Sequence, residues 1–205
     1  NKYSEDAMLM GAEMAYTAKD YEKALTIYKQ LKDKAASMER RQLAKTGMLR
    51  SAHMLGNGEE IILAATDLLA DTKLAPELSN EAHYYRAKAY LDASKTEAAM
   101  EDLKVLAKDT RNVYGAEAKY KVAQIYFDGG QTDKAEQEVL NYIEVSTPHT
   151  YWLARSFVLL ADVYMKLGRN LDAKQYLLSL KQNYQADDDI AGMIESRLEK
   201  LKIKN

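Results

Sequence analysis

The chain has 205 residues, 47% of them hydrophobic and 29% charged, which is typical of a folded protein rather than a disordered one. Its formal net charge is −2, so no excess of basic residues favours a nucleic-acid partner. Cysteine is absent, which excludes disulfides, thiolate metal sites and cysteine nucleophiles. No apolar run approaches the roughly 20 residues that a membrane-spanning helix needs.

Hydrophobic periodicity and turn residues predict eleven helices along the chain, since prolines and glycines are few. Their expected ranges are 3–18, 20–34, 37–55, 59–71, 76–93, 95–108, 113–128, 131–145, 149–167, 169–184 and 187–203. Several boundaries carry signals of their own. These are Pro76 at a first helical position, Ser94 with Glu97 as a capping box, Gly129-Gly130 and Gly168 as left-handed C-caps, and Thr147-Pro148 as an N-cap followed by proline.

A sequence pattern recurs through the chain. It consists of a small residue in one helix, an aromatic residue three positions later, a turn, and then an alanine early in the next helix. The five anchor positions in the second helices are Ala24, Ile61, Ala99, Ala135 and Ala173. Their spacings of 37, 38, 36 and 38 residues indicate a repeat, with a degenerate second copy. We therefore predict a single repeat domain over 1–205 with units at about 3–36, 37–74, 75–111, 112–147 and 148–185.

Small residues are expected to let the two helices of each pair approach closely. In the first helices these are Ala12, Ala87, Ala123 and Ala161, and in the second helices they are Ala24, Ala99, Ala135 and Ala173.

The segments 114–126 and 159–168 read like first helices of tetratricopeptide repeats, and the chain resembles that family over essentially its whole length. The resemblance implies an all-α, right-handed superhelical solenoid of about five helix pairs. The period exceeds the usual 34 or so residues, and the family's tryptophan position holds Met8, Lys45, Tyr84 or a neighbour, and Phe157. These departures are similar to divergent repeats of bacterial outer-membrane assembly and Tol–Pal accessory proteins. The implied location is the bacterial periplasm or cell envelope, with the cytoplasm left open.

The last predicted segment, 187–204, has the pattern of a capping helix. Ile190, Ile194, Leu198 and Leu201 form one apolar stripe, expected to cover Leu177, Leu180 and Tyr184, while the other face is polar. No such cap precedes the first repeat. We therefore expect the chain to be the C-terminal part of a longer protein, with self-association through the uncapped N-terminal end left open.

The sequence contains no constellation of a known catalytic or metal site. His53, His83 and His149 share no ligand spacing, and we interpret them as solvated or groove-lining residues. We predict neither an enzyme, nor a catalytic residue, nor a metal or cofactor.

In the family, the first helices of the repeats line a concave groove that binds partners. The resemblance implies which residues of this chain would line that groove. The candidate residues are Glu13, Tyr16, Arg50, His53, Tyr84, Lys88, Tyr120, Gln124, Phe127 and Asp162. Arg50 and Lys88 are expected to meet a carboxylate, and the aromatic residues to anchor a protein or peptide. The alternative is that some of these side chains pack helix against helix.

The family's clamp for a C-terminal carboxylate needs Lys and Asn where this chain has Leu9 and Glu13, so that use is not expected. The function predicted from the sequence is a non-catalytic protein-binding scaffold. The alternative is a structural or assembly module that oligomerises or spaces domains in a bacterial cell-envelope complex.

Overall fold

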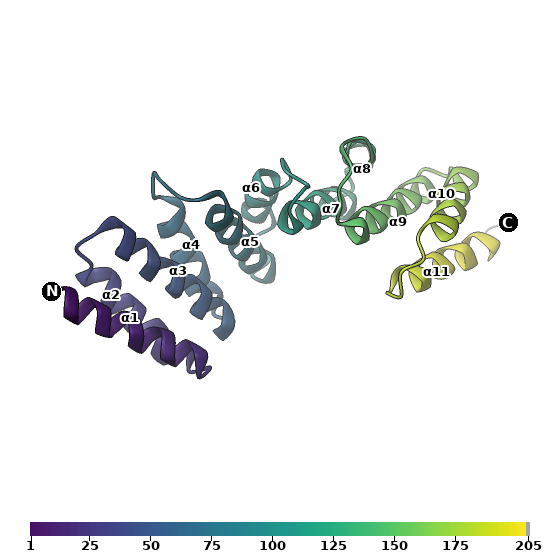
Figure 1. The fold of residues 1–205 in the computed structure, drawn as a ribbon. Helices are drawn as coiled ribbons and strands as arrows, with labels where there is room; N and C mark the ends of the chain where they lie inside the picture. The colour runs from purple at the N-terminus through teal and green to yellow at the C-terminus, as the bar shows by residue number, and fades with distance from the viewer. Residues whose placement is uncertain (204–205) are drawn as a thin grey trace. The chain divides into compact units, whose positions relative to one another are not determined.

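The computed structural model describes residues 1–203, which form eleven helices and no strand (Figure 1). The helices are α1 (Lys2–Thr17), α2 (Tyr21–Lys34), α3 (Met38–Leu55), α4 (Gly58–Leu69), α5 (Pro76–Asp92), α6 (Thr96–Leu106), α7 (Val113–Asp128), α8 (Thr132–Val145), α9 (Thr150–Lys166), α10 (Asn170–Asn183) and α11 (Ile190–Ile203). Every boundary lies within three residues of its predicted position. The all-α helical-repeat prediction is confirmed.

The chain divides into two compact units, Asn1–Asp102 and Leu103–Asn205, and the division falls inside α6. In unit 1, each helix from α1 to α5 packs on the next, and α1, α3 and α5 also contact one another in turn. In unit 2, α7 to α11 pack in the same sequential way, and α7 also contacts α9. The grouping of both units into one domain over 1–205 stays a prediction.

The close approach of paired helices rests on the predicted small residues. Ala12, Ala87, Ala123, Ala161, Ala24, Ala99, Ala135 and Ala173 are all buried. In unit 1, Ala12 and Ala24 share one core cluster with Leu49 and Leu68, and in unit 2 Ala123, Ala135, Ala161 and Ala173 share one with Val139, Leu160 and Leu177. Because these alanines are buried between packed helices, larger side chains there would overpack the interface.

Every helix pair turns on a residue with left-handed backbone, five positions before its anchor. These residues are Lys19, Gly56, Ser94, Gly130 and Gly168, with φ of +63°, +68°, +59°, +80° and +77°. The prediction for Gly130 and Gly168 is confirmed. The capping-box prediction for Ser94 is wrong, because Ser94 lies in the left-handed turn after α5, two residues before α6 begins at Thr96. In the same turn the Lys95 amide donates to the Tyr90 carbonyl at 2.8 Å.

We expect Lys19→Gly and Ser94→Gly each to stabilise the protein by about 0.5–1 kcal/mol, since only glycine adopts this conformation without a Cβ penalty. Urea unfolding of the single variants measures the gain. The same substitution at Lys23, which lies inside α2, serves as the control and is expected to destabilise. Unchanged or lower stability for both turn variants would contradict the expectation.

The predicted start of α9 at Thr147-Pro148 is also wrong, whereas Pro76 begins α5 as predicted. Helix α9 begins only at Thr150, because Thr147 is used to join two loops. Its hydroxyl donates to the Thr110 carbonyl at 2.6 Å, and the Thr110 hydroxyl donates to the Ser146 carbonyl at 2.7 Å. Both threonines are buried, so this reciprocal pair satisfies polar groups that would otherwise lack partners.

In three of the five helix pairs, the residue sixteen positions before the anchor makes a polar contact with the second helix of the pair. This is at or next to the position where tetratricopeptide repeats have a tryptophan. Lys45 contacts Asp71 at 2.7 Å and Asp67 at 3.3 Å, and Lys119 contacts Glu138 at 2.7 Å. In the third pair, His83 Nδ1 lies 2.7 Å from Asp102 Oδ1. The interpretation of His83 as a solvated or groove-lining residue is therefore wrong: it belongs to the contact between α5 and α6.

Helix α11 closes unit 2, as predicted for a cap. Ile190, Ile194 and Leu201 are buried in the same core as Leu177 and Leu180 of α10, with Tyr184 at its edge. The helix begins at Ile190 rather than at 187, since the Asp188 carboxylate accepts the Ile190 amide at 2.9 Å. The predicted cap extended to residue 204, which lies outside the described residues.

Candidate binding face

Six of the ten predicted site residues lie on the three first helices of unit 1. Glu13 and Tyr16 are on α1, Arg50 and His53 on α3, and Tyr84 and Lys88 on α5. Because α1 contacts α3 and α3 contacts α5, these residues occupy neighbouring helices. We call this surface of α1, α3 and α5 the unit 1 face.

An ion pair occupies the middle of the unit 1 face. The Arg50 guanidinium donates from Nε to Glu81 Oε1 at 2.8 Å and from Nη2 to Oε2 at 3.0 Å. The hydrogen bonds to Glu81 raise the pKa of Arg50 above its ordinary value. Arg50 was expected to meet a partner's carboxylate, but it already holds an internal one, which the sequence analysis did not identify.

Aromatic rings flank this ion pair. The His53 ring stacks on Tyr85, with centroids 4.0 Å apart and planes 14° apart, and Lys88 Nζ lies 4.9 Å from the Tyr84 centroid. Burial, assisted by Lys88, lowers the pKa of His53, which favours the neutral form of this imidazole. Tyr85 was not among the predicted residues. Its position directly after the predicted residue Tyr84 is the sequence signal that could have identified it.

A pocket of about 150 Å³ opens between α1 and α3. Its apolar lining comes from Leu9, Tyr16, Leu43 and the buried Tyr28 of α2, and we call Tyr28 its floor. Its charged lining comes from the exposed Glu13 and Arg50, which we call its rim. Burial raises the pKa of Tyr16, Tyr21 and Glu81 add to the shift, and Arg50 opposes it.

The floor of the pocket depends on Gly47. A Cβ at this position would lie 2.4 Å from the Tyr28 ring, so only glycine lets the ring pack flat against α3. Neither this packing nor the pocket beside it was predicted from the sequence.

In unit 2 the four remaining predicted residues make internal contacts. Tyr120 is only 6% exposed, and its hydroxyl donates to Gln124 Oε1 at 2.8 Å and accepts from Arg155 at 3.0 Å. Phe127 packs half-buried against the core. Asp162 accepts two hydrogen bonds, both 3.0 Å, from Arg197 of the capping helix. Their role in partner binding stays a prediction.

In the part of the chain formed by residues 1–203, no group of three or more His, Asp or Glu side chains is arranged to hold a metal ion. None of its helices combines the length and apolar character needed to span a bilayer.

Comparison with known proteins identifies one matching family model and several solved structures with a similar fold. Residues 6–37 match the family model described as "Tetratricopeptide repeat". The structure of MamA is similar at a TM-score of 0.67 and 17% identity, over 91% of this chain and 98% of that one. A tetratricopeptide repeat protein from Parabacteroides merdae matches at 0.58 and 18%, over 98% and 87%. BtubC from P. vanneervenii matches at 0.60 and 14%, over 89% and 83%. Comparison with curated protein sequences gives no match.

These likenesses, with the repeating left-handed turn and the small-residue pairing, define the protein as a helical-repeat protein. Its fold is that of the tetratricopeptide repeat proteins, and residues 6–37, which include most of the first helix pair, are similar to that repeat by sequence as well.

Proposed function

We propose that the protein is a non-catalytic scaffold and that the unit 1 face binds an extended segment of a protein partner. The observation that carries the proposal is the pocket between α1 and α3. At about 150 Å³ it is smaller than the roughly 300–1,000 Å³ of small-molecule sites, and its size suits one side chain.

The chemistry around the pocket supports the same proposal. Leu9, Leu43 and the ring of Tyr16 offer apolar walls, and the Glu13 and Arg50 side chains lie at the rim where a partner's backbone would pass. A rigid apolar centre with a polar rim is the arrangement that concentrates binding energy at protein interfaces. The Arg50–Glu81 pair fixes the rim geometry before any partner arrives, which reduces the ordering cost of binding.

Removal of the pocket wall tests the proposal. Peptides selected from a random displayed library against the whole protein are the probe, and Tyr16→Ala is expected to raise their Kd about tenfold or more, as loss of an aromatic anchor does. Fluorescence anisotropy measures the Kd. Tyr3→Ala makes the same chemical change at an exposed residue of α1 outside the pocket and should leave the Kd unchanged. Equal affinities for the two variants would reject the unit 1 face, provided circular dichroism shows both to be folded.

A second candidate function, self-association, is favoured by one observation. Met10 and Met14 of α1 are 63% and 66% exposed and border a shallow hollow with Thr17. Adjacent exposed methionines on one helix face are adaptable contact surfaces. In this candidate function, the exposed methionines of α1 would contact a helix of a second copy of the chain.

For self-association we expect the mass measured by light scattering to rise with protein concentration. Met10→Lys/Met14→Lys should return the protein to a monomer, because two cations would have to be buried in the contact. A monomeric mass for the unmodified protein at every concentration would rule this candidate out.

A further inference from the structure

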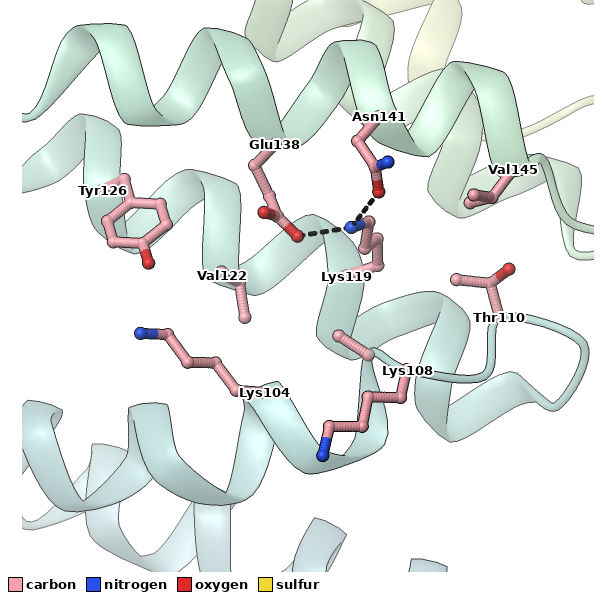
Figure 2. A pocket seen from close by; sticks show the side chains of 10 residues that line it. Lys104, Lys108, Thr110, Lys119, Val122, Tyr126, Glu138, Asn141 and Val145 are labelled. Atoms are coloured by element: carbon pink, nitrogen blue, oxygen red, sulfur yellow. Dashed lines mark hydrogen bonds and ion pairs between the residues drawn. The ribbon is translucent and has the colours of Figure 1, made fainter.

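A second pocket, of about 320 Å³, lies in unit 2 between α6, α7 and α8 (Figure 2). Val122 and Tyr126 of α7 form its base, Lys104 lies on α6, and Glu138 and Asn141 lie on α8. Figure 2 shows Lys119 Nζ turned toward α8, where it pairs with Glu138 at 2.7 Å and donates to Asn141 at 2.6 Å. Lys119 is therefore neutralised, whereas Lys104 extends along the pocket toward Tyr126.

Unit 1 contains the equivalent groove in the repeat register, between α2, α3 and α4. There the two α2 lysines that line the groove each meet a carboxylate on α4: Lys29 contacts Glu60 at 2.7 Å, and Lys32 contacts Asp67 at 3.1 Å. Met48 lies in this groove where Val122 lies in the second pocket, thirteen residues before the respective anchors. The unit 1 groove is thus bridged by opposite charges.

The same positions in unit 2 carry no such bridge. Lys104 takes the place of Lys29, five residues after the anchor, but Lys134 takes the place of Glu60, one residue before it. Asn141 likewise takes the place of Asp67, six residues after the anchor. At these positions a lysine has replaced one carboxylate, and a neutral amide has replaced the other.

Both lysines lie over a single ring. Lys104 Nζ and Lys134 Nζ are each 5.6 Å from the centroid of Tyr126. Lys104 and Lys108 line the pocket, and Lys134 lies next to it through the shared Tyr126 ring. Among the described residues, no carboxylate within 4.0 Å pairs with any of these three lysines, so this surface carries uncompensated positive charge in a chain whose net charge is −2. The ring quadrupole attracts each ammonium group but does not cancel its charge.

We propose that this pocket binds an acidic side chain of a protein partner, with Lys104 in the pocket and Lys134 next to it supplying the positive charge that attracts the carboxylate. The unit 1 groove supplies the argument for a carboxylate, since a glutamate meets the equivalent lysine there at hydrogen-bonding distance. The apolar base at Val122 and Tyr126 accommodates the methylene groups of the incoming side chain. The proposal rests on the scaffold function, but it concerns a surface on the other unit from the unit 1 face.

The test uses the whole protein and a fluorescein-labelled, end-blocked peptide, Ala-Glu-Glu-Leu-Glu-Ala, with its Gln counterpart as the uncharged probe. We expect the Glu peptide to bind and the Gln peptide to bind about tenfold more weakly, as expected when charge-assisted hydrogen bonds are lost. Lys134→Glu places a carboxylate opposite Lys104, as Glu60 stands opposite Lys29, and should weaken binding of the Glu peptide by about tenfold or more. Lys174→Glu, the same charge change at an exposed position of α10, should change it less than about twofold, since no pocket residue is altered.

Three outcomes would overturn the proposal: equal binding of the Glu and Gln peptides, equal loss of binding in Lys134→Glu and Lys174→Glu, or displacement of the Glu peptide by inorganic phosphate at concentrations where acetate has no effect. The last result would assign the pocket to phosphate groups instead. Lys134→Glu is expected to unfold at no lower temperature than the unmodified protein, so misfolding does not explain a loss of binding. Tyr16→Ala should bind the Glu peptide normally, which separates failure of this pocket from failure of the unit 1 face.

Discussion

Replacement of Gly115 by alanine is expected to destabilise unit 2 by more than about 3 kcal/mol, at the upper end of single-substitution effects. Gly115 lies in the first turn of α7, where the Asn112 side chain accepts its amide at 2.9 Å. A Cβ there would lie 1.8 Å from the Asp109 carbonyl oxygen and 2.7 Å from that of Leu106. All of these atoms are backbone, so no rotamer change relieves the clash, and α7 must move away from the end of α6.

Urea unfolding monitored by tryptophan fluorescence measures this effect, since Trp152 of α9 is the only tryptophan and reports on unit 2. Gly192→Ala is the matched control: its Cβ would meet nothing within 4 Å inside α11. We expect that variant to gain about 0.5–1 kcal/mol, the usual difference between alanine and glycine in a helix. A Gly115→Ala variant as stable as the control would contradict the close approach of the two backbones.

The second large effect is expected at Asp102, which is 2% exposed in unit 1. Its carboxylate accepts from Arg86 Nε at 2.9 Å and Nη2 at 2.7 Å, and His83 Nδ1 lies 2.7 Å away. Asp102→Ala leaves the Arg86 guanidinium largely buried without its counter-charge, so we expect a loss of about 3–5 kcal/mol. Asp92→Ala, an exposed aspartate at the end of α5, should be close to neutral by the same urea assay followed by circular dichroism.

Asp102 also predicts how stability depends on acid. Burial alone would raise the pKa of Asp102, but the hydrogen bonds from His83 and Arg86 outweigh it and hold the pKa below its ordinary value. The stabilisation is therefore fully present above the unfolded-state pKa of about 4 and is lost as the pH falls through the lower pKa of the folded state. Between pH 5 and pH 2, the unmodified protein should lose more unfolding free energy than Asp102→Ala. Equal slopes for the two proteins would argue against a buried, ionised carboxylate.

Much of the fold follows from the sequence because the repeat constrains it. The anchors at 36–38-residue intervals, the buried alanines beside them and the glycines at Gly130 and Gly168 all indicate the same helix pairs. The errors arise where one residue type has two uses. Ser94 fits a capping box by spacing, but the repeat register assigns it to the left-handed turn, and comparison with Gly130 in the next pair would have shown this.

The polar contacts between helices were less accessible to sequence reasoning. His83 with Asp102 and Lys119 with Glu138 are both 19 residues apart, the same spacing as Phe157 and Tyr176, whose rings lie 6.1 Å apart. That common spacing was a usable signal. By contrast, the Arg50–Glu81 pair joins α3 to α5 of the next repeat, and the pocket beside it depends on how closely Tyr28 packs on Gly47. Periodicity places residues on a face but does not determine such distances between helices.

The most direct test of the account is a map of where a partner segment binds. Backbone amide spectra of the 15N-labelled protein, recorded with a peptide selected from a random displayed library, resolve the contacted helices. We predict the largest shift changes around Tyr16 of α1, Arg50 and His53 of α3 and Tyr85 of α5, and a return to the free spectrum when Tyr16→Ala is used. Shift changes confined to unit 2 or to the second helices, with none along α1 and α3, would contradict the assignment of the unit 1 face.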